Sequence, residues 1–339
     1  MKQIDGGIGG GQILRLAVSL AALEGIPITI ENVRGGRDDP GLRAQHVAAI
    51  DAVASVTESK FDGVEVGSET VTYEPGTVIG GEASVDVGTA GSISLVFDAV
   101  LPLAMAADRP IVLHATGGTD VKWAPPIDYL RAVKLPFLER FGLEATVRDV
   151  SRGFYPRGGG SATLRLEPSS IEPITCPERG DLEEISIHSV GTRDLSEADV
   201  VSRQVDGARR TLDPEISVPI AEQTASVDAQ STGTSVLVEA RYEQSRAGFS
   251  ALGRPGWPAE EVGEAAGKSF IAFQAETGAV DRHLADQLLP FLAVAGGEIT
   301  TQRITDHVRG AARLLADFDY GVDISEGAQR IRIAATAQG

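Results

Sequence analysis

A pattern of elements that recurs three times constrains this chain more than any other feature of its sequence. In the first occurrence, the apolar run from Gln12 to Leu20 is typical of a buried helix, Pro27 to Ile30 of a strand, and 44–53 of a second helix. A loop rich in glycine and arginine separates the strand from the second helix. Such a unit buries its apolar face only against other elements, so its repetition predicts a mixed α/β fold of packed units.

The second and third occurrences keep the same order of helix, strand, loop, helix and strands. The second opens with the glycine-rich stretch 88–92, which leads into an apolar helix that is expected to end at 103. Its later strands and helix are expected at 110–113, 127–140, 144–150 and 161–166. The elements of the third are expected at 284–295, 298–301, 307–318, 321–324 and 330–333. The units share little sequence identity, so their similarity is one of pattern.

A stretch with its own pattern separates the second unit from the third. Its expected helices and strands lie at 184–187, 198–212, 235–239 and 258–277. A length of 339 residues also favours more than one structural unit. We therefore predict a large domain made of residues 1–181 and 279–339, with a smaller α/β subdomain, 182–278, inserted into it.

The charge of the chain is strongly acidic. There are 48 Asp and Glu residues against 30 Lys and Arg, which gives a net charge of −18. A dense acidic surface stays hydrated at high salt, so the composition favours adaptation to a high-salt cytoplasm, such as that of a halophilic archaeon, over the alternative of an ordinary acidic protein. Net charge argues against a broad basic surface for nucleic acid. At molar salt, however, the Debye length is about 3 Å, so the positions of individual arginines matter more than the sum.

Other features of the composition exclude several classes of protein. A single cysteine, Cys176, excludes a disulfide scaffold and a cysteine-based zinc site. No apolar run approaches the roughly 18 residues of a membrane span. The N-terminal residues contain no apolar stretch typical of a signal peptide. We expect a cytoplasmic protein that does not bind a membrane; the sequence makes no prediction of its oligomeric state.

Two glycine-rich stretches stand directly before predicted helices. Residues 5–12, DGGIGGGQ, precede the first helix, and 88–92, GTAGS, precede its counterpart in the second unit. Glycines allow backbone N–H groups to approach phosphate oxygens at the positive end of a helix. Arg15, Arg34 and Arg37 lie close by in sequence and suit a polyphosphate. The alternatives are tight turns that need positive φ, and arginines that are ordinary surface charges.

Histidines and one apparent phosphate motif complete the candidates. Gln45 and His46 stand at a helix start and could cap it or contact a ligand. His307 begins a helix after a polar loop, and a helix N-terminus keeps imidazole neutral, as a nucleophile requires. It could equally be a simple helix-start residue. Residues 263–269, GEAAGKS, lack the spacing of a phosphate-binding P-loop and lie in a helical stretch.

Taken together, these segments resemble the RNA 3′-terminal phosphate cyclase family over nearly the whole chain. Residues 152–160, RGFYPRGGG, are similar to the family signature R-G-x-x-P-x-G-G-G. The opening 9–15, the arginine-rich run 34–46 and the stretch 283–293, HLADQLLPFLA, also match, in the family's order. The resemblance implies three βαβαββ repeats that form a large domain, with a smaller α/β subdomain inserted.

The resemblance also implies an activity and its partners. The family converts an RNA 3′-terminal phosphate to a 2′,3′-cyclic phosphodiester with ATP and a divalent metal, Mg or Mn. A histidine attacks the α-phosphate of ATP to form a covalent histidine–AMP, and AMP then passes to the RNA 3′-phosphate. The vicinal 2′-hydroxyl displaces AMP and closes the ring. The 2′-hydroxyl cannot close the ring directly, because a phosphate monoester has no good leaving group. Transfer of AMP to the 3′-phosphate supplies one.

Residue by residue, the resemblance assigns roles within this chain. His307 falls at the position of the nucleophile, and Pro125 and His283 fall at positions that sandwich adenine. Asp286 matches an active-site acidic residue and is the candidate metal ligand. The remaining positions, expected to bind ATP or its phosphates, are Gln12, Arg15, Arg34, Arg37, Gln45, His46 and Gln287.

One departure from the family pattern bears on the metal. The family opening carries a glutamate that helps to hold the ion, and Ile8 occupies that position here. Two other functions therefore stay open beside that of an active cyclase. One is a cyclase-like protein of reduced activity that binds RNA or assists ribosome assembly. The other is an adenylyltransferase that acts on other phosphorylated ends.

Overall fold

The first repeat forms one four-stranded sheet in the computed structural model, which describes residues 1–7, 10–327 and 329–337. Strands β1 (Lys2–Asp5) and β2 (Ile28–Glu31) are parallel, and helix α1 (Gly11–Glu24) connects them. Helix α2 (Ala44–Ser55) leads to the antiparallel strands β3 (Lys60–Asp62) and β4 (Val71–Glu74). The sheet order is β1-β2-β4-β3, so the last strand inserts between the second and third.

The second and third repeats have the same topology. The second sheet has the order β5-β6-β8-β7 and the third β9-β14-β16-β15. The second repeat consists of β5 (Gly81–Asp86), α3 (Ile93–Val100), η1 (Leu101–Met105), β6 (Ile111–Gly117), α4 (Ile127–Tyr129), η2 (Leu130–Lys134), α5 (Leu135–Glu139), β7 (Ala145–Ser151) and β8 (Gly160–Leu166). The third consists of β9 (Ile174–Cys176), α8 (Arg282–Ala295), β14 (Gly297–Thr301), α9 (Asp306–Asp317), β15 (Val322–Glu326) and β16 (Ile331–Ala335). Three βαβαββ repeats are thus confirmed.

Two details differ from the expected elements. Each repeat begins with a strand, β1, β5 or β9, that the pattern of helices and strands did not reveal. The helix expected at 127–140 is continuous, but its middle turn, η2, is a π-helix, a local widening of the helical turn.

The inserted segment forms a fourth sheet between β9 and α8. Its strands are β10 (Leu182–Thr192), β11 (Ile220–Val227), β12 (Thr234–Tyr242) and β13 (Arg246–Leu252), in the order β11-β10-β12-β13. The short helix η3 (Arg193–Ala198) precedes α6 (Val200–Leu212), and α7 (Ala259–Gln274) follows the last strand. The P-loop-like residues 263–269 lie inside α7, as expected of a helix.

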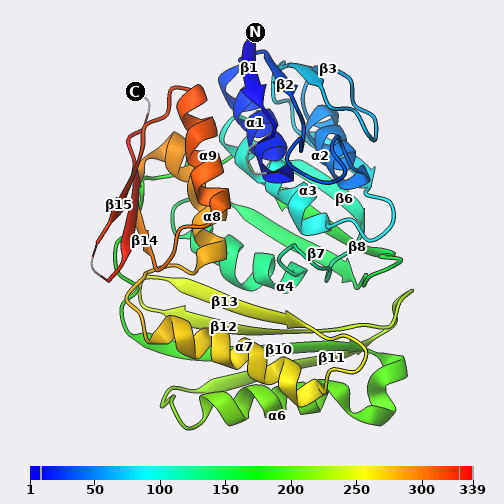
Figure 1. Ribbon diagram of the computed structural model, residues 1–339, viewed down its shortest axis with the longest axis vertical. Coiled ribbons are helices and arrows are strands. Elements are labelled where there is room, and N and C mark those ends of the chain that lie inside the picture. Colours follow the sequence, from blue (N-terminus) through cyan, green and yellow to red (C-terminus); the bar gives the residue numbers. More distant parts are fainter. Residues whose placement is uncertain (8–9, 328, 338–339) are drawn as a thin grey trace.

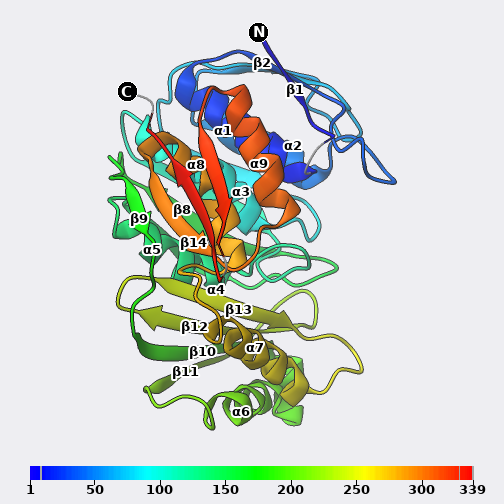
Figure 2. The ribbon, with the colours of Figure 1, turned by 60° about the vertical axis from the view of Figure 1, so that its left-hand side comes forward.

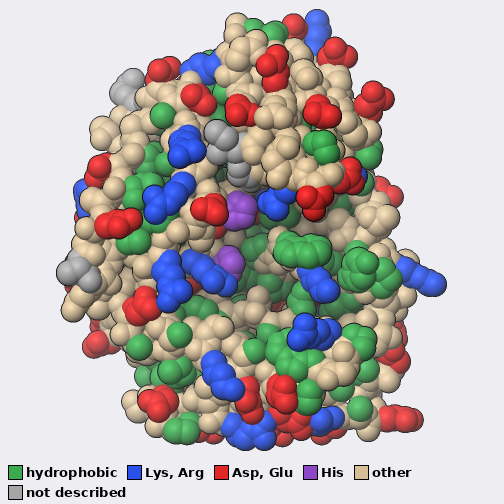
Figure 3. Space-filling model, in the orientation of Figure 1, with side chains coloured by type: hydrophobic (Ala, Val, Ile, Leu, Met, Phe, Trp, Pro, Cys, Tyr) green, Lys and Arg blue, Asp and Glu red, His purple; other side chains and the backbone are tan. Residues whose placement is uncertain are grey.

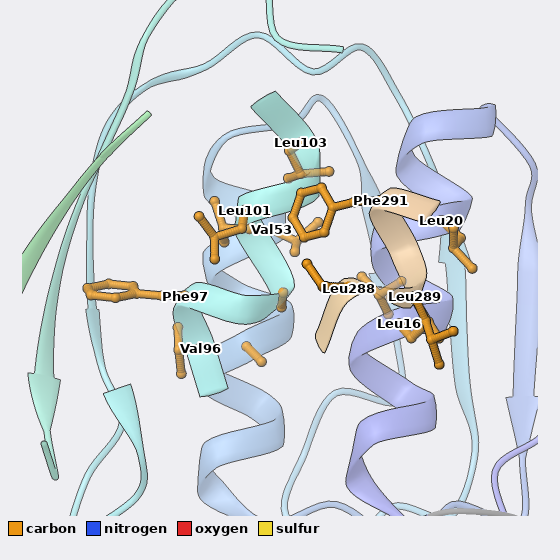
Figure 4. Packing of buried hydrophobic residues seen from close by; sticks show 14 of the residues in the cluster. Leu16, Leu20, Val53, Val96, Phe97, Leu101, Leu103, Leu288, Leu289 and Phe291 are labelled. Atoms are coloured by element: carbon orange, nitrogen blue, oxygen red, sulfur yellow. The ribbon is translucent and has the colours of Figure 1, made fainter. Parts of the chain in front are cut away.

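The helices of the three repeats pack against one another between the three sheets (Figures 1 and 2). Figure 4 shows Val53 of α2, Leu101 and Leu103 of η1 and Phe291 of α8 close together, whereas Phe97 of α3 points to the other side of its helix; all are buried. This interior continues into the sheets as a single apolar cluster. Residues of β10, β12, α6 and α7 form a second cluster. The domain limits at 181 and 279 stay a prediction.

Arg179 ties the two ends of the inserted segment together. Its guanidinium donates hydrogen bonds to the carbonyl oxygens of Phe273, Gln274, Glu276 and Gly278, at 2.7–3.3 Å. It also lies 4.7 Å from the ring centre of Phe273. The chain therefore enters and leaves the inserted segment at neighbouring points.

Candidate functional site

The glycine-rich opening places the uncapped start of α1 at the carboxyl ends of β1 and β2. Gly10 precedes the helix with φ of 66°, a conformation that favours glycine, and no side chain caps the helix there. The neighbouring loop packs closely: the backbone N–H of Arg34 donates to the carbonyl oxygen of Gly6 at 3.0 Å. Backbone N–H groups at an open helix start bind anions.

His46 faces this helix start from α2. A Cβ at Gly11 would lie 2.1 Å from Nε2 of His46, so glycine is needed for the imidazole to approach. Nδ1 of His46 accepts a hydrogen bond from the backbone N–H of Arg43 at 3.0 Å, which leaves the proton on Nε2. Burial, and then the positive charges of Arg15, Arg34 and Arg43, lower its pKa to about 3. His46 is a neutral donor aimed at the start of α1.

The three predicted arginines surround the same place in different ways. Arg34 stabilises its own loop by donating to the carbonyl oxygens of Asp39, at 2.9 Å, and Gly41, at 2.7 Å. Arg37 is exposed, and its Nη2 lies 3.3 Å from the position that a Cβ on Gly10 would take. Arg15 points from the second turn of α1; burial lowers its pKa. The helix start is therefore lined by cations.

His307 stands in the first turn of α9, which begins at Asp306. Thr305 caps this helix: its hydroxyl accepts a hydrogen bond from the backbone N–H of Val308 at 3.1 Å. Partial burial, followed by the charges of Arg15 and Arg37, lowers the pKa of His307. The exposed imidazole of the third repeat therefore lies within electrostatic reach of arginines from the first, and its unprotonated form predominates at neutral pH.

Asp286 supports the helix of His307. Its carboxylate accepts a 2.5 Å hydrogen bond from the Thr305 hydroxyl. Burial raises its pKa to about 7, and the nearby charge of Asp281 also raises it. In the described part of the chain, no three His, Cys, Asp or Glu residues come together as a metal site. One carboxyl group engaged with a hydroxyl does not fit a metal site built by the protein. Ile8 lies outside the described residues.

His283 lies beside a cavity between the third repeat and the inserted segment. The cavity has a volume of about 230 Å³ and is lined by His283, Arg303, Phe249 and Phe273, among others. Tyr129 meets His283 edge to face, with ring centres 6.5 Å apart. Pro125, the other residue expected at adenine, does not line this cavity. Glu276 and Asp281 also line it, and a cavity that combines aromatic rings with polar groups suits a nucleotide base.

Four predicted residues have a position in the fold, but the contacts of the described residues do not define their role in the site. Gln45 lies against the opening of the second repeat, because a Cβ on Gly91 would lie 3.2 Å from its Cβ. Gln12 and Gln287 stand on α1 and α8, half-buried, and Pro125 is half-buried before α4. Their roles stay predictions.

Asp281, which was not among the predicted site residues, joins three parts of the structure. Its carboxylate accepts hydrogen bonds from the Tyr129 hydroxyl at 2.9 Å, from the backbone N–H of Gly248 at 3.1 Å, and from the backbone N–H groups of His283 and Leu284. It thereby caps α8 and holds β13 of the inserted segment and α4 of the second repeat around His283. Aspartate before an apolar helical run is the sequence signal for such a cap.

The signature segment 152–160 holds loops together. Half-buried Arg152 pairs with two buried carboxylates, Asp120 at 3.1 Å and Asp128 at 2.6 Å. Burial is the main cause that raises the pKa of Asp120, and the Arg152 charge opposes it. Glycine is required because a Cβ on Gly153 would lie 2.4 Å from the carbonyl oxygen of Gly117. The signature therefore fixes the backbone beside the site.

Figure 3 shows two histidine side chains in a hollow across one face of the molecule, with Lys and Arg side chains on either side. No helix in the described ranges is both long and apolar enough to cross a membrane.

The chain combines three βαβαββ repeats and an inserted α/β segment with histidines and arginines around an open helix start, which defines a class of α/β protein with a cationic site. The family model for RNA 3′-terminal phosphate cyclase matches residues 6–323, and the chain belongs to this family. The resemblance and fold predicted from the sequence are thus confirmed.

Relatives that bear the name RNA 3′-terminal phosphate cyclase match most of the chain. A protein of Halobacterium salinarum, a halophilic archaeon, is 48% identical over 335 residues, which cover 96% of each chain. One of Pyrococcus furiosus is 40% identical over 308 residues, 90% of this chain and 89% of its own. One of Archaeoglobus fulgidus is 39% identical over 322 residues, 94% of this chain and 95% of its own.

Proposed function

We propose that this protein is an enzyme that converts an RNA 3′-terminal phosphate to a 2′,3′-cyclic phosphodiester with ATP, through a covalent AMP on His307. The observation that carries the proposal is the position of His307: it is exposed at the start of α9, and its pKa is lowered by burial and by Arg15 and Arg37. A neutral imidazole has a free lone pair, and arginines beside it attract a triphosphate.

The first step is attack of the imidazole of His307 on the α-phosphorus of ATP. A P–N bond forms, the bond between the α-phosphorus and its bridging oxygen breaks, and pyrophosphate leaves. Arg15, Arg37 and the open start of α1 stabilise the negative charge on the phosphate oxygens. His46 donates its Nε2 proton to a phosphate oxygen as a hydrogen bond and stays neutral. The cavity beside His283 binds adenine.

Two displacements complete the reaction. An oxygen of the RNA 3′-phosphate attacks the same phosphorus, the P–N bond breaks, and His307 is regenerated. The 2′-hydroxyl then attacks the 3′-phosphorus, loses its proton, and AMP leaves as the ring closes. The family implies Mg or Mn as well. Because the described residues build no site for a free ion, we draw no step through it.

The direct test is labelling with α-labelled ATP. The wild-type protein should acquire an acid-labile, alkali-stable label, as expected of a P–N bond, and should cyclise an oligonucleotide that carries a 3′-phosphate. His307→Ala should acquire none. His114→Ala, which removes a half-exposed histidine from β6, is the matched control and should be labelled. Label on His307→Ala would contradict the assignment of the nucleophile.

The other outcomes separate the alternatives. A wild-type protein that binds RNA without acquiring label would favour the cyclase-like protein of reduced activity. Label without cyclisation of RNA would favour an adenylyltransferase that acts on other ends. We further propose that the protein works in a cytoplasm of high salt, which the net charge of −18 supports.

A further inference from the structure

Two aromatic side chains are held in solvent on adjacent loops. Trp123 is 96% exposed and Tyr155 66% exposed. Among the described residues, the other large apolar side chains with comparable exposure are Met1 and Val66. Aromatic residues are only 5% of the chain and elsewhere contribute to its interior, so two exposed on neighbouring loops require an explanation.

The backbone at Trp123, the more exposed of the two aromatic residues, is strained. Its φ is 62°, in the left-handed region that a bulky L-residue rarely occupies. Such a conformation costs about 1–3 kcal/mol and persists only where the surroundings fix it. An isolated loop residue would relax, so the loop itself must be held.

The two loops are held together at their bases. The backbone N–H groups of Thr119 and Asp120 both donate to the carbonyl oxygen of Gly153, at 2.9 and 3.2 Å. Arg152 reaches across to Asp120 and Asp128 with buried ion pairs. The loop of Trp123 and the loop of Tyr155 are therefore parts of one rigid support.

Each aromatic residue has an unpaired cation beside it in sequence. Lys122 precedes Trp123, and Arg157 follows Tyr155 by two positions; both are exposed. Within the described ranges, neither side chain makes an ion pair or a hydrogen bond. In a chain where acidic residues outnumber basic ones by 48 to 30, cations without a carboxylate partner are available to an external anion.

Contacts connect this support to the phosphate site. A Cβ on Gly158 would lie 2.2 Å from the carbonyl oxygen of Thr89, so the loop of Tyr155 touches the opening of the second repeat. That opening in turn touches Gln45, the neighbour of His46, through Gly91. Figure 3 shows hydrophobic and basic side chains grouped beside the hollow that contains the histidines.

We propose that Trp123 and Tyr155, with Lys122 and Arg157, form a platform for the single-stranded RNA that precedes the reacting 3′ end. Bases stack on the two rings, and backbone phosphates contact the two cations. Stacking on aromatic faces is tolerant of sequence and short in range, so it persists at a salt concentration that screens diffuse charge. Aromatic rings beside cations suit single-stranded nucleic acid, which has planar bases and a negatively charged backbone. This inference rests on the proposed function, because it assumes that RNA is the substrate.

The test compares RNA binding by matched variants at molar potassium chloride. The probe is a fluorescent single-stranded oligonucleotide of about ten nucleotides with a 3′-phosphate. Trp123→Ala/Tyr155→Ala should weaken its binding by about 5- to 150-fold for each stacked base that is lost. Trp123→Phe, which keeps an aromatic face, should retain most of the affinity. The double variant should also lose the preference of the wild type for this oligonucleotide over a mononucleoside 3′-phosphate, measured as a ratio of KM values.

The cations are tested by the salt dependence of the same affinity. Lys122→Gln/Arg157→Gln should make the slope of log affinity against log salt shallower by about 1.4, or 0.7 for each phosphate contact. Lys60→Gln, at an exposed lysine on β3, and Val66→Ala are the matched controls.

Equal RNA affinities of the wild type and the aromatic double variant would overturn the proposal. A dimer of the wild type that dissociates in the double variant, without a change in RNA affinity, would instead identify a self-association surface. Failure of the proposed function is distinguishable: the wild type would then acquire no label from ATP and cyclise no RNA, whatever the variants bind.

Discussion

Replacement of His46 by glutamine should change the pH dependence of stability by a predictable amount. In the folded protein the pKa of His46 is about 3, because burial and three arginines disfavour its charged form. In the unfolded chain it is about 6.5. Below pH 6.5 the unfolded chain therefore binds a proton that the folded protein does not, and the free energy of unfolding falls as the pH falls.

The size of the effect follows from the two pKa values. The contribution of neutral His46 is fully present above about pH 6.5 and is lost as the pH falls toward 3, by about 1.4 kcal/mol for each pH unit. Between pH 8 and pH 4.5 the wild type should lose about 3 kcal/mol from this residue alone. Asp286, whose pKa is raised to about 7, acts in the opposite sense, since it stabilises the fold at low pH and loses that contribution as the pH rises through 7. Asp286 is present in both proteins, so its contribution cancels in their difference.

The assay is urea unfolding of the wild type and His46→Gln in molar potassium chloride at pH 8, 6.5 and 4.5. At pH 8 the variant should be less stable by about 1–3 kcal/mol, because the backbone N–H of Arg43 loses its acceptor. At pH 4.5 this difference should vanish or reverse. His114→Gln, a change at a half-exposed position on β6, controls for histidine loss in general. A stability difference that stays constant from pH 8 to 4.5 would refute the neutral, buried imidazole.

Further outcomes concern the helix start, the Asp281 junction and salt. Gly11→Ala should displace the His46 ring at a cost of about 1–3 kcal/mol, and this cost should largely disappear in a His46→Ala background; an unchanged cost would contradict the contact. Asp281→Ala should lower the free energy of unfolding by about 3–5 kcal/mol, since the Tyr129 hydroxyl and three backbone N–H groups lose their acceptor. Asp281→Asn should lower it by about half as much, because the amide keeps one oxygen that can accept hydrogen bonds. Equal losses for the two variants would refute the role of that oxygen. The net charge of −18 predicts a Tm that rises from low to molar potassium chloride, and a Tm independent of salt would contradict halophilic adaptation.

The sequence predicted the repeated fold because its signals are local. Apolar periodicity marks α1, α8 and α9, and β-branched runs mark β2 and β6. The first strands of the repeats were not predicted because they are short or partly exposed. Strand β9 has only three residues, and the inserted segment separates it in sequence from its partner β14. A π-helical turn such as η2 has no sequence signal of this kind.

The candidate site was predicted from motifs, and its interactions were not. The start of α9 at Asp306 agrees with the helix-start position expected of His307. The hydrogen bond of Asp286 to Thr305, and the four donors that meet at Asp281, depend on tertiary contacts between segments distant in sequence. The charges that disfavour protonation of His46 come from Arg15 on α1 and from Arg34 and Arg43 in the segment between β2 and α2. Such features follow from the assembled fold.

The hydrogen bonds of Arg179, which hold the two ends of the inserted segment together, affect the order in which the chain folds during synthesis. Ile174 of β9 pairs with Gly297 of β14, about 120 positions later, so the third sheet waits for the inserted segment to be made. If that segment were unfolded, closure across it would cost about 1.6 kcal/mol more than across a loop of about 20 residues. Once it has folded, Arg179 holds residues 273–278 beside the point of entry, and the remaining connection is short. Early folding of the inserted segment thus lets the last repeat assemble as though its chain were nearly continuous.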